Sequence, residues 1–306
     1  MRVIVIGGSG FLGAQLGLSI AEHGFHGASL SRRPANTFDQ SHLLEEPGNL
    51  AQLLDSAEWD VVINTVAIAS HEECERNPDL AHTVNALWPE EWAKMCRARE
   101  VPFVHISTDA VFSGEHHEPY TEQSVVGPTS QYGTSKREGE VRVLASSPDA
   151  LVVRTNFFGW SASGRVGILD FFFRHLSEGH PVTGFTDYVT SSIYAGDLAD
   201  ALWDLISARA SGILHVTSST PLSKYEFGCA VAEVFGLPAS LITPGSKDSG
   251  DLAVRRGSFL GLSTQKAERL VGRELPSTVS GLERAQRERE LCVKYFERPL
   301  EGGSAR

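Results

Sequence analysis

The chain has 306 residues, and its 27 lysines and arginines against 38 aspartates and glutamates leave a net charge of −11 with neutral histidines. The length exceeds one typical domain, and a composition of 41% hydrophobic and 21% charged residues excludes wholesale disorder. The negative balance provides no basic face for nucleic acid, and no run of about 18 apolar residues predicts a membrane span. We therefore expect a globular α/β protein of one large domain or of two lobes that share a site.

The cysteines and the N-terminus indicate the compartment. Four widely spaced cysteines, Cys74, Cys96, Cys229 and Cys292, form no Cys-x-x-Cys motif. This spacing predicts ordinary thiols of a reducing cytoplasm, with neither disulfides nor a cysteine-based zinc site. The apolar run at the N-terminus is too short for the core of a signal peptide and lacks its small-residue cleavage site. The sequence thus predicts a cytoplasmic protein, and no ligand cluster in it indicates a metal.

The first half of the chain alternates short apolar runs with longer amphipathic stretches. A buried strand is predicted at 3–6, followed by a helix with Leu12, Leu16 and Ile20 at helical spacing. Further strands are predicted at 28–31, 60–66, 101–107 and 150–154. Helices are predicted at 80–99, where Pro89 divides or kinks the helix, and at 130–145. The repeated β-α-β order predicts a Rossmann-type, doubly wound parallel sheet with right-handed crossovers.

The second half of the chain has a different pattern. Helices are predicted at 168–176, 222–235, 263–271 and 281–296, and the mixed charges of the last of these indicate a solvated face. A further sheet strand is predicted at 213–216, and a polar loop at 242–250. No long linker separates the two halves, so the boundary near Thr155 rests on the change of pattern alone.

A glycine-rich segment, Gly7-Gly8-Ser9-Gly10-Phe11-Leu12-Gly13, lies between the first predicted strand and the first helix. Glycines at these spacings allow a tight turn, a close approach of the backbone to a pyrophosphate, and close packing of the helix on the sheet. The N–H groups at the start of the helix then bind phosphate. In this position the segment predicts a dinucleotide-binding turn, with a plain glycine-rich turn as the alternative.

Ser31-Arg32-Arg33 ends the second predicted strand, where NAD-binding proteins usually carry an acidic residue for the ribose 2′-hydroxyl. No acidic residue follows before Asp39. The two arginines would bind the 2′-phosphate of NADP through charge-assisted hydrogen bonds. We therefore expect NADP as the cofactor. NAD is the alternative, because paired arginines also occur as exposed loop charges without a ligand.

Three further residues have the types and spacing that carbonyl reduction requires. Thr108 follows the strand predicted at 101–107, at the sheet edge where parallel sheets bind ligands. Tyr132 and Lys136 are four residues apart, on one face of a helix. A nearby ammonium group stabilises a phenolate and lowers the pKa of the tyrosine toward working pH. Taken alone, Tyr132 is equally consistent with a half-buried surface aromatic and Lys136 with a solvated charge. Together with Thr108 and the glycine segment they predict a nicotinamide-dependent carbonyl reductase.

These motifs resemble the extended short-chain dehydrogenase/reductases, and within them the dTDP-4-dehydrorhamnose reductase family. The most specific stretches are Ile106-Ser107-Thr108-Asp109-Ala110-Val111-Phe112-Ser113-Gly114 and Gln131-Tyr132-Gly133-Thr134-Ser135-Lys136. The resemblance extends over nearly the whole chain, although its specific motifs lie in the first half. It implies NADP-dependent reduction of a nucleotide-activated 4-keto-6-deoxy sugar. Members of this family often dimerise, so the resemblance also implies a homodimer.

The resemblance also implies roles for individual residues. Tyr132 would be the general acid for the C4 oxygen, Lys136 would lower its pKa and hold the nicotinamide ribose, and Thr108 would hydrogen-bond the carbonyl. The cofactor would contact Gly7, Ser9, Gly10, Phe11, Leu12, Gly13, Ser31, Arg32, Arg33, Asn64, Thr65, Val66, Ala67, Tyr132 and Lys136. The substrate would contact Asp109, Val111, Phe112, Asn156, Phe158, Trp160 and Arg256. Packing at the strand end or in the core is the alternative for Val66, Ala67 and Trp160, and a solvated loop for Arg256.

We expect residues 1–155 to form the NAD(P)-binding Rossmann domain, with a returning strand and helix around 191–220. Residues 156–190 and 221–300 are expected to form a smaller C-terminal substrate-binding lobe.

The residue after Asp109 separates activities within the superfamily. Sugar-nucleotide 4,6-dehydratases that resemble this fold carry Asp-Glu there, whereas this chain has Asp109-Ala110 and so lacks the second carboxyl group. Ala110 also replaces the aromatic residue that is usual in the reductase family, so the identity of the sugar is not determined by the resemblance. Two alternatives remain: an NADP-binding regulatory subunit resembling the methionine adenosyltransferase beta subunit, and a nucleotide-sugar epimerase.

Overall fold

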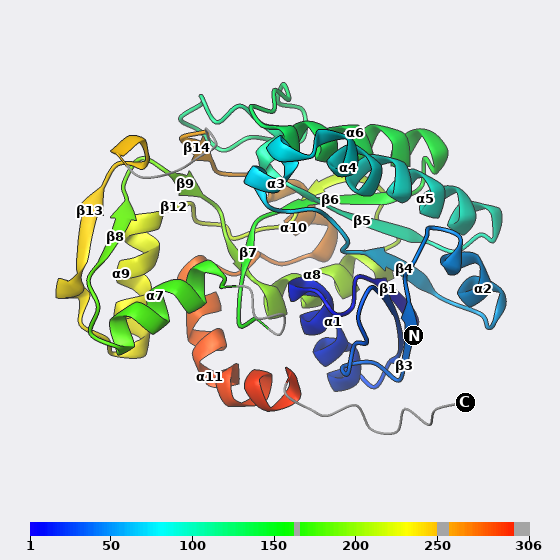
Figure 1. Cartoon of the computed structure of the whole chain (residues 1–306), viewed down its shortest axis with the longest axis horizontal. Helices are drawn as coiled ribbons and strands as arrows, with labels where there is room; N and C mark the ends of the chain where they lie inside the picture. The colour runs from blue at the N-terminus through cyan, green and yellow to red at the C-terminus, as the bar shows by residue number, and fades with distance from the viewer. Residues whose placement is uncertain (162–165, 250–256, 297–306) are drawn as a thin grey trace.

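The computed structural model describes residues 1–161, 166–249 and 257–296. A seven-stranded sheet lies at the centre, in the order β11-β6-β5-β4-β1-β2-β3 (Figure 1). All of its neighbouring strands run parallel, which confirms the predicted doubly wound α/β fold. The strands are β1 (Arg2–Ile6), β2 (His26–Ser31), β3 (Gln40–Leu43), β4 (Val61–Asn64), β5 (Phe103–Thr108), β6 (Leu151–Thr155) and β11 (Gly212–His215).

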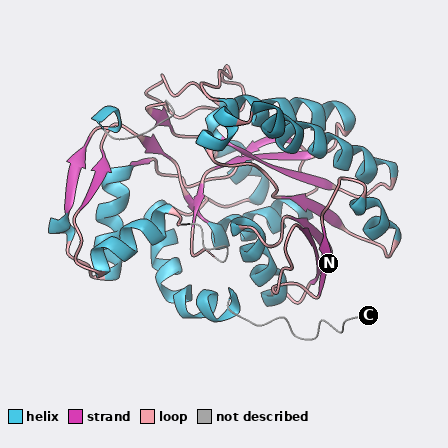
Figure 2. Ribbon diagram, viewed as in Figure 1, coloured by secondary structure: helices cyan, strands magenta, loops and turns pink. Residues whose placement is uncertain are grey.

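Helices cover both faces of the sheet, because successive residues of a strand point to opposite sides (Figure 2). Val3 and Val5 of β1 belong to one buried core, while Ile4 and Ile6 belong to the other. The first core is covered by α1 (Phe11–Glu22), α8 (Ala195–Ser207) and α10 (Gln265–Val271). The second is covered by α2 (Asn49–Asp55), α5 (Trp88–Ala98) and α6 (Gln131–Ser146).

The strand order reverses beside β1, because β2 follows on one side and β4 lies on the other. Open α/β sheets bind their ligands outside the carboxyl ends of the strands at such a reversal. Residues 7–13 leave the end of β1 at this point, and the end of β4 lies next to it. The helices between β4 and β5 are α3 (His71–Arg76), α4 (Pro78–His82), the π-helix η1 (Thr83–Leu87) and α5, and the short η2 (Asp109–Val111) follows β5.

The remaining elements gather at one side of the sheet, around an apolar core that includes Phe158, Phe172 and Phe227 (Figure 1). They are β7 (Phe157–Phe158), α7 (Ile168–Ser177), β8 (Val182–Phe185), β9 (Val189–Thr190), β10 (Ile193–Tyr194), β12 (Leu222–Ser223), α9 (Lys224–Phe235), η3 (Ala239–Leu241), β13 (Ile242–Gly245), η4 (Lys247–Ser249), β14 (Phe259–Leu260) and α11 (Thr278–Phe296). Within the described ranges, no helix is both long and apolar enough to cross a bilayer.

The structure corrects several predicted elements. The prediction of a loop at 242–250 is wrong in part, because β13 pairs in parallel with β8. This pairing uses main-chain hydrogen bonds, which a polar sequence does not reveal. The helix expected from residue 222 begins at Lys224. Ser223 caps it by accepting the Glu226 N–H, and the Glu226 carboxylate accepts the Ser223 N–H in return. The predicted helix at 80–99 is interrupted by η1, and Pro89 lies at the start of α5, where its missing N–H costs nothing.

A buried ion pair attaches α6 to the sheet. Arg154 of β6 donates two hydrogen bonds of 2.8 Å to the Glu140 carboxylate, and Ser107 Oγ of β5 donates a third of 2.6 Å. Glu140 is 0% exposed and Arg154 is 1% exposed. Burial alone would raise the pKa of Glu140, but the hydrogen bonds and charge of Arg154 outweigh it, and the pKa is lowered. The charged pair therefore fixes the position of α6 on β5 and β6.

Replacing Glu140 with glutamine tests this attachment. Glu140→Gln leaves the Arg154 charge buried without its counter-charge, so we expect the free energy of unfolding to fall by about 3–5 kcal/mol. Glu91→Gln is the matched control, because Glu91 pairs with Lys94 at the surface and should contribute less than about 1 kcal/mol. Urea unfolding followed by circular dichroism measures both, and equal small losses would contradict a structural role for the buried pair.

Candidate active site

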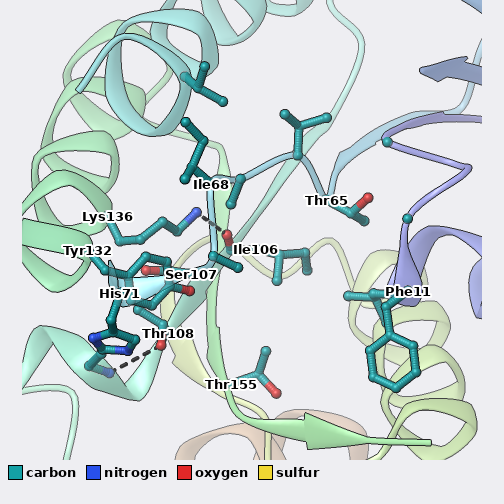
Figure 3. A pocket seen from close by; sticks show the side chains of 18 of the residues that line it. Phe11, Thr65, Ile68, His71, Ile106, Ser107, Thr108, Tyr132, Lys136 and Thr155 are labelled. Carbon is teal, nitrogen blue, oxygen red and sulfur yellow. Dashed lines mark hydrogen bonds between the residues drawn. The ribbon is translucent and has the colours of Figure 1, made fainter. Parts of the chain in front are cut away.

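A cavity of about 1010 Å³ lies along the carboxyl edge of the sheet. Its walls come from residues 7 and 9–12, the ends of β2, β5 and β6, residues 65–69 after β4, and the helices α3 and α6, with Tyr188, Gly257 and Leu260 from the second half of the chain. Figure 3 shows Phe11 and Thr65 on one side of the view, and Thr108, Tyr132 and Lys136 on the other. This volume lies at the upper end of the range for small-molecule sites, so the cavity has room for an extended ligand.

The glycine segment has the shape that a phosphate-binding turn requires. Gly7 has a φ of +97°, and a Cβ there would lie 2.6 Å from Thr65 Oγ1. A Cβ on Gly13 would lie 2.2 Å from the Gly7 carbonyl oxygen, so only glycine lets α1 start this close to the turn. The N-cap of α1 is Gly10, which places no capping side chain over the first N–H groups. This cradle fits the phosphates of a dinucleotide.

The expected residues of this segment divide into two groups. Gly7, Ser9, Gly10, Phe11 and Leu12 line the cavity. Gly13 is buried and does not line the cavity. It lets α1 pack closely against the turn, because it has no Cβ.

Arg32 and Arg33 are exposed and line the cavity together with Ser31 at the end of β2. Asp39 lies elsewhere, because its carboxylate accepts the N–H of Gly27 (2.9 Å) near the beginning of that strand. The cavity end of β2 therefore carries guanidinium groups and not the Asp39 carboxylate. Such an end is suited to a ribose phosphate rather than to a free 2′-hydroxyl.

The segment after β4 is only partly at the cavity. Thr65, Val66 and Ala67 line it, as expected. Asn64 does not, because it is 0% exposed and its Oδ1 accepts the N–H of Val66 (2.9 Å). Asn64 thus stabilises the turn after β4 through this hydrogen bond and does not line the cavity.

Thr108, Tyr132 and Lys136 all line the cavity, where β5 and α6 lie side by side (Figure 3). Lys136 Nζ donates a hydrogen bond to the Ile106 carbonyl (2.6 Å). Thr108 Oγ1 donates to Asp109 Oδ1 (3.0 Å) and accepts the Ala110 N–H (3.2 Å). The three residues that the sequence singled out for proton and hydride chemistry therefore share one wall.

The charge states of this wall differ from simple expectation. Burial raises the pKa of Tyr132, and its hydrogen bond with Thr108 opposes the rise only in part. The sequence predicted a pKa lowered by Lys136, but the Lys136 Nζ is bound to the Ile106 carbonyl and burial of the phenol dominates. Burial also lowers the pKa of Lys136 to about 8, against the opposing charge of Glu140. At neutral pH both the Tyr132 phenol and the Lys136 ammonium are therefore protonated.

The residues expected to contact a substrate are divided between the cavity and the cores. Asp109, Phe112 and Asn156 line the cavity, and Asn156 Nδ2 donates to Asp109 Oδ2 (2.9 Å). Val111 is fully buried in an apolar cluster with Tyr120. Phe158 and Trp160 are also buried, in the apolar core of the second half of the chain. Arg256 lies outside the described residues.

Sequence reasoning missed three polar residues at this site. The His71 ring lies 4.9 Å from the Tyr132 ring, and both line the cavity. Thr155 also lines it, and its buried Oγ1 has no partner among the described residues. His105 is fully buried, with its Nε2 3.3 Å from Lys136 Nζ. Their positions were the only signal: Thr155 ends β6, His105 lies within β5, and His71 begins the helix that follows β4. Residue type alone did not separate them from core and loop residues.

Comparison with known proteins finds one family model that matches most of the chain, and several reductases among the similar proteins. A family model described as RmlD substrate binding domain matches residues 1–290. A probable low-salt glycan biosynthesis reductase from Haloferax volcanii is 36% identical over 250 residues, which are 79% of this chain and 83% of that protein. A dTDP-4-dehydrorhamnose reductase from Mycolicibacterium smegmatis is 32% identical over 271 residues, or 87% and 79% of the two chains. The crystal structure of a dTDP-4-dehydrorhamnose reductase from Bacillus anthracis in complex with NADP has a TM-score of 0.84 at 25% identity, covering 94% of this chain and 99% of that one.

The buried Lys136 cation predicts a pH dependence of stability. Its pKa of about 8 in the folded chain lies below the ordinary value of 10.5, so the unfolded chain binds more protons between these two values. The free energy of unfolding should therefore rise with pH across this window, relative to that of Lys136→Met. Urea unfolding at several pH values measures the difference, with Lys94→Met on the surface of α5 as the control. Parallel curves for the wild type and Lys136→Met would contradict a lowered pKa.

Proposed function

Because the chain belongs to the RmlD substrate binding domain family, we propose that it is an NADP-dependent reductase of a nucleotide sugar, similar to dTDP-4-dehydrorhamnose reductase. The observation that carries the proposal is one cavity that is lined by the glycine turn at the end of β1, by Thr108 of β5 and by Tyr132 of α6. The finer proposal is that the carbonyl at C4 of a 4-keto-6-deoxy sugar is reduced.

Residues at one side of the cavity would hold the cofactor. Gly7, Gly10 and the first turn of α1 fit its diphosphate, and Arg32 and Arg33 fit its 2′-phosphate. Lys136 reaches the same cavity from α6, at the place proposed for the nicotinamide ribose. Bound there, NADPH supplies the hydride for the reduction.

The protein's own residues would handle the proton. Thr108 Oγ1 would orient the sugar carbonyl through a hydrogen bond, and Tyr132 would give its proton to the oxygen as an alcohol forms. Its raised pKa keeps the phenol protonated before the reaction, but it also makes Tyr132 a weaker acid, so the phenolate needs stabilisation as it forms. The ammonium of Lys136 would stabilise the phenolate that results.

The substrate would lie against the second half of the chain. We propose that residues 1–155 and about 191–220 hold the cofactor, and that residues 156–190 and 221–300 hold the sugar nucleotide. Asn156 and Asp109 form a polar pair at the cavity between the two parts. Ala110 lines the same cavity, and its methyl group offers no second carboxyl for elimination of water. This chemistry favours reduction over dehydration.

Replacing Tyr132 with phenylalanine tests the function. The substitution removes the proton donor and little else, so we expect turnover to fall by about 100-fold or more while NADPH still binds. The measurement is the loss of NADPH absorbance with purified protein and freshly made dTDP-4-keto-6-deoxyhexose, with and without a 3,5-epimerase. Tyr225→Phe, on α9 and away from the cavity, is the matched control.

The outcomes separate the candidate activities. Oxidation of NADPH only with the epimerase indicates a rhamnose-type reductase, and oxidation without it indicates a reductase of another deoxysugar series. Unchanged turnover in Tyr132→Phe would refute the proposed acid. Bound NADPH without any turnover on these sugars would instead favour the regulatory-subunit or epimerase alternatives.

A further inference from the structure

A buried chain of polar groups leads from the turn after β4 to Lys136. The Val66 N–H donates to Asn64 Oδ1 (2.9 Å), and Asn64 Nδ2 lies 3.0 Å from His105 Nδ1. His105 Nε2 then lies 3.3 Å from Lys136 Nζ. Asn64 and His105 are 0% exposed and Lys136 is 1% exposed, so these contacts are made away from bulk solvent. Asn64 and His105 do not line the cavity, and the proposed reaction leaves both without a role.

The chain of contacts fixes where His105 carries its proton. Because Asn64 Oδ1 accepts the Val66 N–H, the NH₂ group of Asn64 faces His105. An amide NH₂ can only donate, so His105 Nδ1 must accept. The ring is neutral, because burial and the charge of Lys136 hold the pKa of His105 well below its ordinary value. A neutral ring has one proton, and the hydrogen-bond network assigns it to Nε2, facing Lys136 Nζ.

An N–H directed at Nζ favours one form of Lys136. The neutral amine has a lone pair that accepts this hydrogen, whereas an ammonium group has only donors. The Ile106 carbonyl accepts a hydrogen bond from either form. His105 therefore favours loss of a proton from Lys136.

Charged and titratable groups on the neighbouring elements complete the surroundings of this ammonium. Glu140, one turn further along α6, stabilises it but is itself paired with Arg154 of β6. Tyr132 lies one turn before it on α6, and Asp109 follows β5 at the cavity. His71 of α3 packs against Tyr132. His105 is the group in direct contact with Nζ that opposes the ammonium form.

We propose that His105, held in one tautomer by Asn64, is a positioning residue that keeps Lys136 ready to release a proton. The inference rests on the proposed reductase function. When the Tyr132 O–H bond breaks and the sugar alcohol forms, an N–H bond of Lys136 breaks, and a water between the two side chains passes this proton on to restore the Tyr132 O–H. The neutral amine accepts the Nε2–H of His105 until water returns a proton to Lys136.

The tautomer is tested without substrate or cofactor by ¹⁵N NMR of protein labelled with ¹⁵N-histidine. The signal that disappears in His105→Phe, or in His105→Asn if the first variant does not fold, identifies the ring. We expect its proton on Nε2, without titration from about pH 5 to 8. In Asn64→Asp the carboxylate accepts from both Val66 and Nδ1, so the proton should move to Nδ1. A wild-type ring with its proton on Nδ1, or a charged ring, overturns the proposal.

The effect on Lys136 is tested by the pH dependence of turnover. Asn64→Asp turns the lone pair of Nε2 toward Lys136 and adds a negative charge, so the alkaline limb should move up by on the order of one pH unit or more. Adding His105→Phe or His105→Asn should remove much of this shift, because the two residues act in series. A full shift without His105 would mean that the new carboxylate acts directly, and would overturn the proposal. If the protein proves not to be a reductase, unfolding of the same variants across pH reports the pKa of Lys136 separately.

Discussion

Burial of the Lys136 side chain is the constraint on which the site depends. A cation removed from water needs fixed acceptors or a counter-charge, and here the Ile106 carbonyl accepts a 2.6 Å hydrogen bond while Glu140 lies one turn away on the same helix. Both are available only if α6 lies at one depth on β5. The pair of Glu140 with Arg154 fixes that depth, and the same placement brings Tyr132 to the cavity beside Thr108. Structural and chemical demands on α6 are therefore met by one set of contacts.

The sheet connects this wall with the rest of the cavity. The strand order reverses beside β1, so the glycine turn, the end of β4 and the end of β5 open onto one space. Gly7 and Gly13 let α1 begin close to that space, and Arg32 and Arg33 extend it beyond β2. An elongated ligand lying along the edge would present one end to the arginines and the other to Tyr132. This is the geometry that a hydride transfer between a dinucleotide and a second molecule requires.

Local patterns predicted the parts of this arrangement that depend on neighbours in sequence. The β-branched runs gave the central strands, and the spacing of Tyr132 and Lys136 gave their common helix face. Tertiary contacts decided the rest. Asn64 has the polar character of a site residue, but its side chain is buried and accepts a hydrogen bond from the Val66 N–H instead of lining the cavity. Trp160 has the aromatic character of a sugar platform but donates its indole N–H to the Ala285 carbonyl in the core. The raised pKa of Tyr132 follows from burial, which residue spacing does not reveal.

The central claim, hydride transfer to a nucleotide sugar at this cavity, is tested most directly with NADPH that carries deuterium in place of both hydrogens at C4 of the nicotinamide. The product sugar nucleotide is then analysed by mass spectrometry and NMR. The account predicts that deuterium appears at C4 of the sugar in proportion to the NADPH oxidised. Oxidation of NADPH with deuterium at another carbon of the sugar, or with none in the sugar, would contradict it.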